Sequence, residues 1–411
     1  MIEPVGKCRV CGSTNLEFLF SLGNHYVNDF VEPGKEHSGI QCPISLELCR
    51  DCTLVQLQHT APQDFLYSRH YWYKSGVNEA MRDALFEAAN TVTKTALHLQ
   101  PGDVVLDIGS NDGTMLRYFN PQLVTVGVEP ATNLAEEGAD GIHFFINDFW
   151  SAESYFKAVK KKAKIVTAFG MFYDLEDPNP FIADVAKVLH EDGLFVAQLM
   201  CLKNMLDMRD VGNLAHEHLE FYSIRSLDYL LGKHGLAMFG VQTNDVNGQS
   251  YRLFCCHANR VEDFKKRCDL DSPEYYRGLE AGLDDPNFYS DWFDELEANR
   301  NDCRNFIFDE VKKGKRVWVY GASTKGNTIL QYYDLDSSVI EGAADRSPSK
   351  WGKVTVGTGI PIHSEEHARE QRPDYFLALP YAFINQFVKR EHAFMERGGR
   401  FIVPLPQFGV I

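Results

Sequence analysis

The sequence has no long hydrophobic run. Across its 411 residues, no stretch approaches the ~18 consecutive apolar residues that a membrane-spanning helix needs. Met1 to Pro4 also do not begin a signal peptide. We therefore expect a cytoplasmic protein that has no membrane partner.

Positive charge is also scarce. The chain carries 41 Lys and Arg against 57 Asp and Glu, a formal net charge of −16. The one sizeable basic run, residues 160–162, is typical of a solvated helix end. Because a negative protein repels phosphate backbones, we expect no nucleic-acid partner.

The length and composition predict more than one domain. Hydrophobic residues make up 44% of the 411 residues, which is enough for a sizeable core. Single cores stop growing at roughly 250–300 residues, so we expect two or three domains.

Four of the ten cysteines form two Cys-x-x-Cys pairs, Cys8 with Cys11 and Cys49 with Cys52. The pairs adjoin short apolar runs at residues 16–22 and 44–48 that read as strands. Disulfides do not persist in the cytoplasm, whereas two such pairs supply the four thiolates of a tetrahedral zinc. We predict a structural zinc, because four protein ligands leave no open position for a substrate.

Two other interpretations of these cysteines compete with zinc. Four reduced cysteines can be buried by coincidence, and a Cys-x-x-Cys pair can be a redox centre. Neither pair opens a helix after a strand, as a thioredoxin-like redox motif would. Cys42 lies near the second pair and leaves the ligand assignment ambiguous.

A buried strand at residues 104–108 runs into a turn punctuated by Gly109 and Gly113. This pattern is typical of a parallel strand followed by the start of a helix, at which glycine lets the backbone approach a ligand. The spacing is not GxGxxG, and it resembles motif I of class I methyltransferases. A plain NAD site and a strand-end cap by Asp107 are the alternatives.

The following strands also end in residues suited to a nucleoside. The run 123–128 ends at Glu129, where one carboxylate can accept both ribose hydroxyls. The run 142–146 leads to Asp148 and Phe149, which fit an adenine amine and an adenine ring, and a fourth strand covers 165–169. The predicted S-adenosylmethionine-binding residues are Asp107, Gly109, Ser110, Asn111, Gly113, Glu129, Pro130, Asp148, Phe149 and Phe169, and a family resemblance adds Ser75.

The densest cluster of titratable side chains is His216-Glu217-His218. It lacks the HExxH spacing of a zinc protease. It follows a fifth strand at 194–200, so we expect it at the carboxyl edge of the sheet, where substrates lie. A histidine with a neighbouring carboxylate can act as a general base. The alternative is a satisfied pair on a surface helix start.

The last third begins with a helical stretch at 272–315 and continues with a strand, a glycine turn at Gly321 and Gly326, and a helix start. This predicts a second Rossmann-like unit. The glycines miss the dinucleotide fingerprint, so we expect no second redox cofactor. The helix start can receive a pyrophosphate, or the unit is a lid.

Together these motifs resemble the NDP-sugar C-methyltransferases, which include the 3-C-methyltransferases of branched deoxysugar biosynthesis. The resemblance covers nearly the whole chain. It is carried by the two Cys-x-x-Cys pairs, by Tyr71-Trp72-Tyr73-Lys74-Ser75, by residues 172–179 and 244–252, and by His216-Glu217-His218-Leu219.

The resemblance implies an α/β protein with a doubly wound class I methyltransferase sheet between two other domains. The expected division is a zinc-binding and substrate-capping domain at 1–75, the methyltransferase domain at 76–265, a helical connection at 266–314, and a Rossmann-like domain at 315–411 that holds the nucleotide-sugar. We expect S-adenosylmethionine and structural zinc as cofactors, and a monomer or weak homodimer.

The resemblance also implies a chemistry. His218 is the expected base that removes the proton next to the ketone of a nucleoside-diphosphate keto-sugar, at C3 of a 4-keto sugar, with Glu217 holding it in place. Tyr71 or Tyr73 would donate a hydrogen bond to the enolate oxygen. The expected substrate-binding residues are His216, Tyr173, Tyr222, Asn247, Ser250, Arg252, Ser323, Lys325 and Asn327.

The sequence departs from the family pattern at three places. Several members carry a tyrosine in place of Ala215 and a histidine near Tyr173, and the usual glycine pair is here Gly248-Gln249. The predicted base is unaffected. A small-molecule O- or N-methyltransferase and a non-catalytic S-adenosylmethionine-binding scaffold remain the alternative functions.

Overall fold

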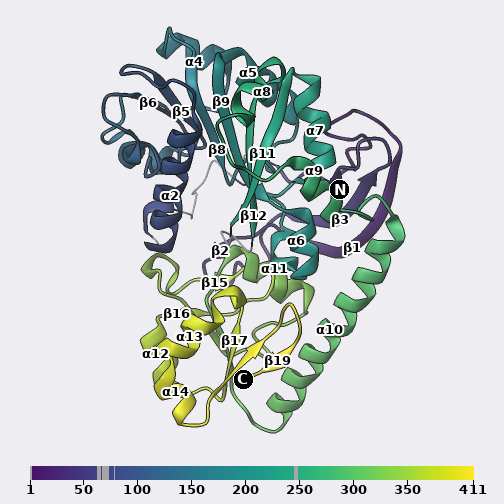
Figure 1. Ribbon diagram of the computed structural model, residues 1–411. Helices are drawn as coiled ribbons and strands as arrows, with labels where there is room; N and C mark the ends of the chain where they lie inside the picture. Colours follow the sequence, from purple (N-terminus) through teal and green to yellow (C-terminus); the bar gives the residue numbers. More distant parts are fainter. Residues whose placement is uncertain (1, 63–65, 67–73, 78, 245–248) are drawn as a thin grey trace.

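A computed structural model of the 411-residue chain describes residues 2–62, 66, 74–77, 79–244 and 249–411 (Figure 1). Tyr71, Tyr73 and Asn247 lie outside the described residues. The described chain forms one small antiparallel sheet, a seven-stranded sheet, a six-stranded sheet and a two-stranded ribbon.

The N-terminal module, defined here as residues 2–62, is built on the small sheet. Its strands are β1 (Leu16–Tyr26), β3 (Gln41–Cys49) and β4 (Val55–Leu57), which contain the predicted runs at 16–22 and 44–48. The fourth strand, β10 (Glu220–Phe221), comes from a distant part of the chain and pairs with β4. The module also pairs through β2 (Phe30–Val31) with β15 (Val354–Thr355) near the other end of the sequence.

The central sheet has the order β11-β12-β9-β8-β5-β6-β7. Its strands β5 to β9 are parallel, and β12 is antiparallel to both of its neighbours. This arrangement is the predicted class I methyltransferase sheet. The strands are β5 (Val104–Ile108), β6 (Val124–Val128), β7 (Phe144–Ile146), β8 (Ala163–Phe169), β9 (Leu189–Met200), β11 (Leu236–Asn244) and β12 (Ser250–His257).

Helices cover both faces of this sheet because its strands are apolar on both sides (Figure 1). Side chains alternate along a strand, so Val105 of β5 joins one core while Val104 and Leu106 join the other. The first core includes α2 (Glu79–Thr95) and α8 (Val261–Lys265), and the second includes α4 (Ala152–Ala158), α5 (Pro178–Val188) and α7 (Ile224–Lys233). Shorter helices are α3 (Ala135–Ala139) and α6 (Leu202–Asp207).

The predicted helical stretch forms α9 (Pro273–Leu279) and the 27-residue α10 (Pro286–Lys312). Asp285 caps α10 by accepting a hydrogen bond from the Asn287 amide, and Pro286 occupies the first turn, where its missing N–H costs nothing. Trp292 of α10 donates to the Leu206 carbonyl, and Asn299 donates to the Pro404 carbonyl. The helix therefore links α6 to the segment at Pro404 near the end of the chain (Figure 1).

The C-terminal sheet confirms the second Rossmann-like unit. Its order is β16-β14-β13-β17-β18-β19, and only the β18–β19 pairing is antiparallel. The strands are β13 (Val317–Tyr320), β14 (Gly342–Ala344), β16 (Ile362–His363), β17 (Tyr375–Ala378), β18 (Arg400–Val403) and β19 (Gly409–Val410). The helices are α11 (Thr324–Tyr332), α12 (Glu365–Glu370), α13 (Ile384–Arg390) and α14 (His392–Glu396).

No helix in the described ranges combines the length and the apolar character needed to cross a membrane.

Candidate functional site

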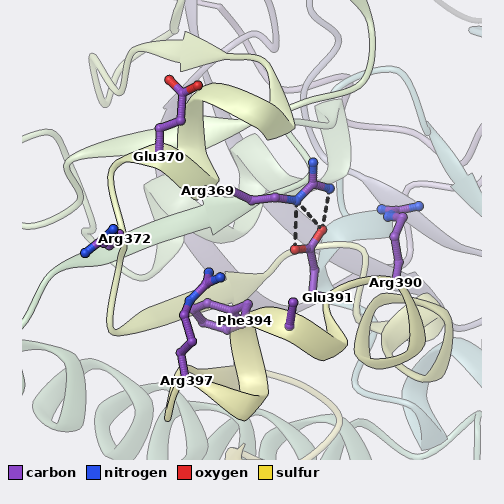
Figure 2. Close-up of a pocket in the computed structure, with 8 residues that line it drawn as sticks. Arg369, Glu370, Arg372, Arg390, Glu391, Phe394 and Arg397 are labelled. Atoms are coloured by element: carbon purple, nitrogen blue, oxygen red, sulfur yellow. Dashed lines mark hydrogen bonds and ion pairs between the residues drawn. The ribbon is translucent and has the colours of Figure 1, made fainter.

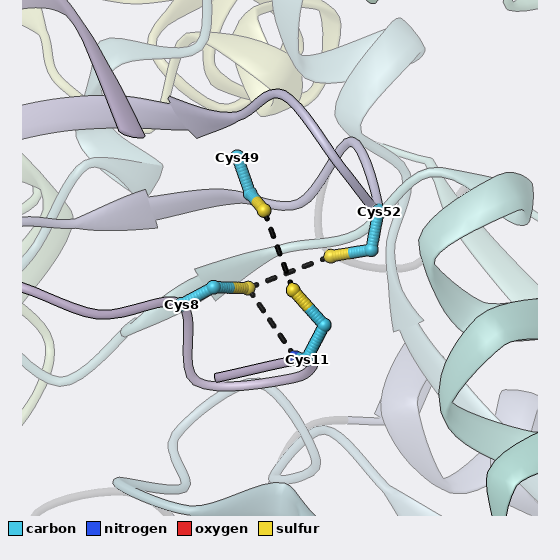
Figure 3. Close-up of side chains that lie close together, drawn as sticks. All are labelled: Cys8, Cys11, Cys49 and Cys52. Carbon is cyan, nitrogen blue, oxygen red and sulfur yellow. Dashed lines mark hydrogen bonds between the residues drawn. The ribbon is translucent and has the colours of Figure 1, made fainter. Parts of the chain in front are cut away.

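The two Cys-x-x-Cys pairs converge in the N-terminal module (Figure 3). The Sγ atoms of Cys8 and Cys52 lie 3.4 Å apart and those of Cys11 and Cys49 lie 3.5 Å apart, and all four lie within 4.8 Å of one another. Four thiolates around one zinc at about 2.3 Å would lie about 3.8 Å apart. The donor set and its spacing therefore fit a tetrahedral zinc.

Local structure explains why the sulfurs meet. Gly12 adopts a φ of 79°, which a residue with a side chain rarely adopts, and it closes the turn after the first pair. The Cys11 amide also points at the Cys8 sulfur, 3.5 Å away. The contact with Cys52 lowers the pKa of Cys8 to about 5, whereas burial raises the pKa of Cys11 to about 11.

Cys42 does not belong to this cluster. It lies opposite His25 in the β1–β3 ladder, and its thiol packs in a separate small core with Val27 and Ala61. The ambiguity left by the sequence is therefore resolved in favour of Cys8, Cys11, Cys49 and Cys52.

A small cavity lies at the carboxyl end of β5. Gly109, at a φ of 72°, forms its floor, and a Cβ there would come within 2.7 Å of the Met171 side chain. Only glycine fits this turn without displacing a neighbour. The cavity is lined by Ser75, Leu85, Asp107, Gly109, Ser110, Asn111, Thr114, Met115 and Phe169.

One buried carboxylate, Asp107, lines this cavity, and a second, Glu129, is hydrogen-bonded to the lining residue Asn111. The Asp107 carboxylate accepts a hydrogen bond from the Thr167 hydroxyl at 2.6 Å, and burial raises the pKa of Asp107 to about 7. The Glu129 carboxylate accepts from the Asn111 amide at 3.0 Å and from the Ala131 amide at 2.8 Å, which fixes it at the end of β6. Burial also raises the pKa of Glu129.

The other predicted cofactor residues lie around the same edge of the sheet. Gly113 has a φ of 74°, and Pro130 follows Glu129 directly. Asp148 and Phe149 follow β7 and are exposed, with Phe149 61% accessible. These residues can therefore reach a ligand that extends out of the cavity. Sequence reasoning missed Leu85, Thr114 and Met115, although Thr114 directly follows Gly113 of the predicted glycine turn.

Arg252 supports the cavity wall instead of facing solvent. Its side chain is 3% exposed, it pairs with Glu87 at 2.8 Å, and its Nε donates to Gln198 at 3.1 Å. The guanidinium lies 5.8 Å from the centre of the Phe169 ring. The neighbouring Ser250 is also buried.

The segment around His218 is a buried loop between the short helix Val211–Asn213 and β10, and not a helix start on the surface. The His218 Nδ1 lies 2.8 Å from the Asn213 carbonyl oxygen, and its ring meets the Tyr173 ring edge-on at 4.8 Å. A carbonyl can only accept, so Nδ1 carries the hydrogen. The Nε2 lone pair of the neutral ring is then available to accept a proton.

Burial keeps the His218 ring neutral. Burial, with the nearby positive charge of Lys325, lowers the pKa of His218 to about 3. Lys325 comes from the first turn of α11 in the C-terminal unit, and a Cβ on Gly212 would lie only 3.1 Å from the Lys325 Cβ. The C-terminal unit thus contributes directly to the surroundings of the loop.

Glu217 precedes His218 in the chain, and the charge of Lys325 acts on its carboxyl group as well. Burial raises the pKa of Glu217, and the charge of Lys325 opposes that rise. Its buried Oε2 has no hydrogen-bond partner among the described residues. This oxygen is therefore able to accept a hydrogen bond from a ligand.

The remaining predicted substrate residues lie in less accessible places. Tyr222 is fully buried and stacks on Phe172 at 5.2 Å, and His216 is 1% exposed. Ser323 caps α11 by accepting from the Gly326 amide, while Asn327 donates to the Asp29 carbonyl in the N-terminal module. Of the three predicted C-terminal residues, Lys325 is the one whose charge acts on the His218 loop.

A larger cavity of about 440 Å³ lies elsewhere, over helices α12 to α14 of the C-terminal unit (Figure 2). Four arginines line it, and the Arg369 guanidinium forms paired hydrogen bonds with the buried carboxylate of Glu391. Tyr320 donates to the same carboxylate at 2.7 Å. None of the predicted site residues lines this cavity.

Three family models match consecutive parts of the chain. A zinc binding domain matches residues 8–67, a methyltransferase domain matches 77–239, and a C-methyltransferase C-terminal domain matches 245–406. The chain is also 29% identical over 419 residues to the C-methyltransferase NovU of Streptomyces niveus, which covers 100% of this chain and 98% of NovU.

Solved methyltransferases resemble part of the chain. Magnesium protoporphyrin IX methyltransferase of Synechocystis PCC 6803, with bound S-adenosylhomocysteine, is 12% identical and covers 46% of this chain and 91% of its own, with a TM-score of 0.34. An S-adenosylmethionine-dependent methyltransferase of Clostridium acetobutylicum is 11% identical and covers 44% and 94%, with a TM-score of 0.33.

The sheet order, the cysteine cluster and the three family models define a class of protein. The chain is a methyltransferase that depends on S-adenosylmethionine and carries a zinc-binding domain at its N-terminal end. It is a C-methyltransferase similar to NovU.

Proposed function

We propose that the chain methylates a ring carbon next to the ketone of a nucleoside-diphosphate keto-sugar, at C3 of a 4-keto sugar. S-adenosylmethionine supplies a methyl group on a sulfonium and becomes a thioether when it has lost that group. The substrate loses the C3 proton, its enolate carbon forms the new C–C bond, and the C–S bond of the cofactor breaks.

One observation carries the role of base. His218 is held as the Nδ1–H tautomer by the Asn213 carbonyl at 2.8 Å, so Nε2 is the ring nitrogen whose lone pair can accept a proton. A fixed, neutral imidazole is the form that can remove a proton near neutral pH. The proton leaves C3 and binds Nε2, and the backbone carbonyl stabilises the imidazolium that results.

The neighbouring Lys325 bears on the substrate's negative charge and not on the base. Lys325 lies close enough to lower the pKa of His218 and to oppose the rise in the pKa of Glu217. An ammonium group next to the base also favours negative charge that develops on a substrate oxygen. We assign Lys325 to the enolate or the diphosphate, and Glu217 to a sugar hydroxyl.

The cofactor residues complete the proposal. Glu129 would hold the ribose hydroxyls, because two backbone amides fix its carboxylate at the tip of β6. Asp107 and the Gly109 turn would hold the amino-acid end. Tyr71, Tyr73 and Asn247 keep their predicted roles as proposals, because they lie outside the described residues.

The test compares wild-type protein with His218→Gln on a panel of nucleoside-diphosphate 4-keto-sugars, and the exposed His392→Gln serves as a matched control. We expect His218→Gln to lower turnover by about 10²–10⁴-fold while S-adenosylhomocysteine still binds. In D₂O without S-adenosylmethionine, only wild type and His392→Gln should exchange the C3 proton.

Each alternative has its own result. Turnover near the wild-type rate in His218→Gln refutes the base. A methyl group found by NMR on oxygen or nitrogen shows an O- or N-methyltransferase. If no S-adenosylhomocysteine forms with any sugar of the panel, the proposed sugar substrate is wrong, and the result favours a non-catalytic S-adenosylmethionine-binding scaffold.

A further inference from the structure

His216 points into the N-terminal module and away from solvent. Its ring is 1% exposed, and its Nε2 lies 2.8 Å from the carbonyl oxygen of Cys42 in β3. A carbonyl only accepts, so Nε2 carries the hydrogen. His216 and His218 are therefore opposite tautomers, each fixed by one backbone carbonyl.

The other end of the same loop is attached to the same module. The Leu57 amide of β4 donates to the Leu219 carbonyl at 2.9 Å, and Glu220 pairs with Gln56 in the β4–β10 ladder. His218 thus lies between two residues that are hydrogen-bonded to the module, His216 through its side chain to β3 and Leu219 through its backbone to β4. Both strands flank the second cysteine pair, because β3 ends at Cys49 and β4 begins shortly after Cys52.

The methyltransferase domain holds the loop from the opposite side. The Leu219 amide donates to the Tyr173 carbonyl at 2.8 Å, and the His218 ring is bonded to the Asn213 carbonyl. The position of the base is therefore set by contacts with both the N-terminal module and the methyltransferase domain. Loss of one contact moves the ring relative to a substrate held by the other elements.

We propose that His216 is a positioning residue, which pins the loop of the base to β3 of the zinc-stapled module and does not touch the sugar. This inference rests on the proposed role of His218. A displacement of about 1 Å at a reacting group can cost about 10²-fold in rate, so the anchor matters for turnover even without substrate contact.

Three substitutions at His216 separate this role from others. The side-chain amide of His216→Gln reaches the position of Nε2 and can donate to the Cys42 carbonyl. The amide of His216→Asn has the same chemistry but is one methylene shorter, and His216→Leu cannot donate at all. For each variant we would measure kcat, the KM of a 4-keto-sugar substrate, S-adenosylhomocysteine affinity and bound zinc.

We expect kcat to fall by about 10²-fold in His216→Asn and His216→Leu, and to be largely restored in His216→Gln. Cofactor affinity and zinc content should stay at wild-type values. If His216→Leu does not fold, the contrast between the asparagine and glutamine variants decides. Equal kcat in those two variants overturns the proposal, and so does a loss confined to the KM of the sugar, which indicates a substrate ligand.

His218→Gln, measured in the same series, separates the two proposals. If His218→Gln is inactive while His216→Asn has wild-type kcat, only the positioning role is wrong. If His218→Gln retains wild-type kcat, the base itself is wrong.

Discussion

Cofactor binding should release a proton from Asp107. Burial raises the pKa of this carboxyl to about 7 in the ligand-free protein, and its only protein donor among the described residues is the Thr167 hydroxyl. S-adenosylmethionine carries a sulfonium and an ammonium group, and a cation beside a carboxylate lowers its pKa. We therefore expect Asp107 to be protonated in part before binding and ionised after it.

The magnitude follows from the pKa. A group with a pKa near 7 that ionises fully on binding releases about 0.9 proton at pH 6, about 0.5 at pH 7 and about 0.1 at pH 8. The affinity should then tighten about fivefold from pH 6 to pH 7 and about twofold from pH 7 to pH 8. The affinity must increase with pH, because a carboxyl group with a raised pKa is protonated at low pH and has to lose that proton when the cofactor binds.

Isothermal titration calorimetry in phosphate and in Tris measures the released protons, since the two buffers differ in ionisation enthalpy. Asp107→Asn is the matched variant, because its side-chain oxygen can still accept from Thr167. The number of protons released by the wild type, minus the number released by Asp107→Asn, should be about 0.9 at pH 6, about 0.5 at pH 7 and about 0.1 at pH 8. If the two proteins release equal numbers of protons at pH 6, or if the difference in released protons grows with pH, Asp107 does not ionise on cofactor binding.

Two further predictions concern the N-terminal module and one backbone position. Cys49→Ser should lower zinc content and melting temperature, whereas Cys42→Ser should keep one zinc per chain, as elemental analysis would measure; equal zinc loss in both variants contradicts the ligand assignment. Gln249 has a φ of 81°, a region that costs a residue with a side chain about 1–2 kcal/mol. Gln249→Gly should therefore raise the free energy of unfolding by about 0.5–1 kcal/mol after the entropy of glycine is subtracted. The control Gln242→Gly, inside β11, should lower the free energy of unfolding, and denaturant melts that show the same sign for both glycine variants would contradict the prediction.

The parts of the fold that sequence predicted well are those fixed by local pattern. The buried runs around Asp107 and Glu129 became β5 and β6 because parallel strands are apolar on both faces. The cysteine pairs met because their spacing alone allows four sulfurs to surround one ion.

Sequence could not predict which way the polar residues of the loop point. Tyr222 and His216 both read as substrate residues, yet one stacks on Phe172 and the other bonds to Cys42. Asn327 follows a glycine turn that suits a phosphate, yet it donates to Asp29. These orientations depend on contacts between segments far apart in the chain, and nothing in the local pattern signals them.

The four-stranded sheet of the N-terminal module has a consequence for how the chain is made. Its outer strand β10 leaves the ribosome only after most of the central sheet, so the edge of β4 stays without its partner throughout that synthesis. An unpaired strand edge is a site at which nascent chains aggregate. Early zinc capture would keep that edge folded while it waits, and truncation before Phe221 would leave it open permanently.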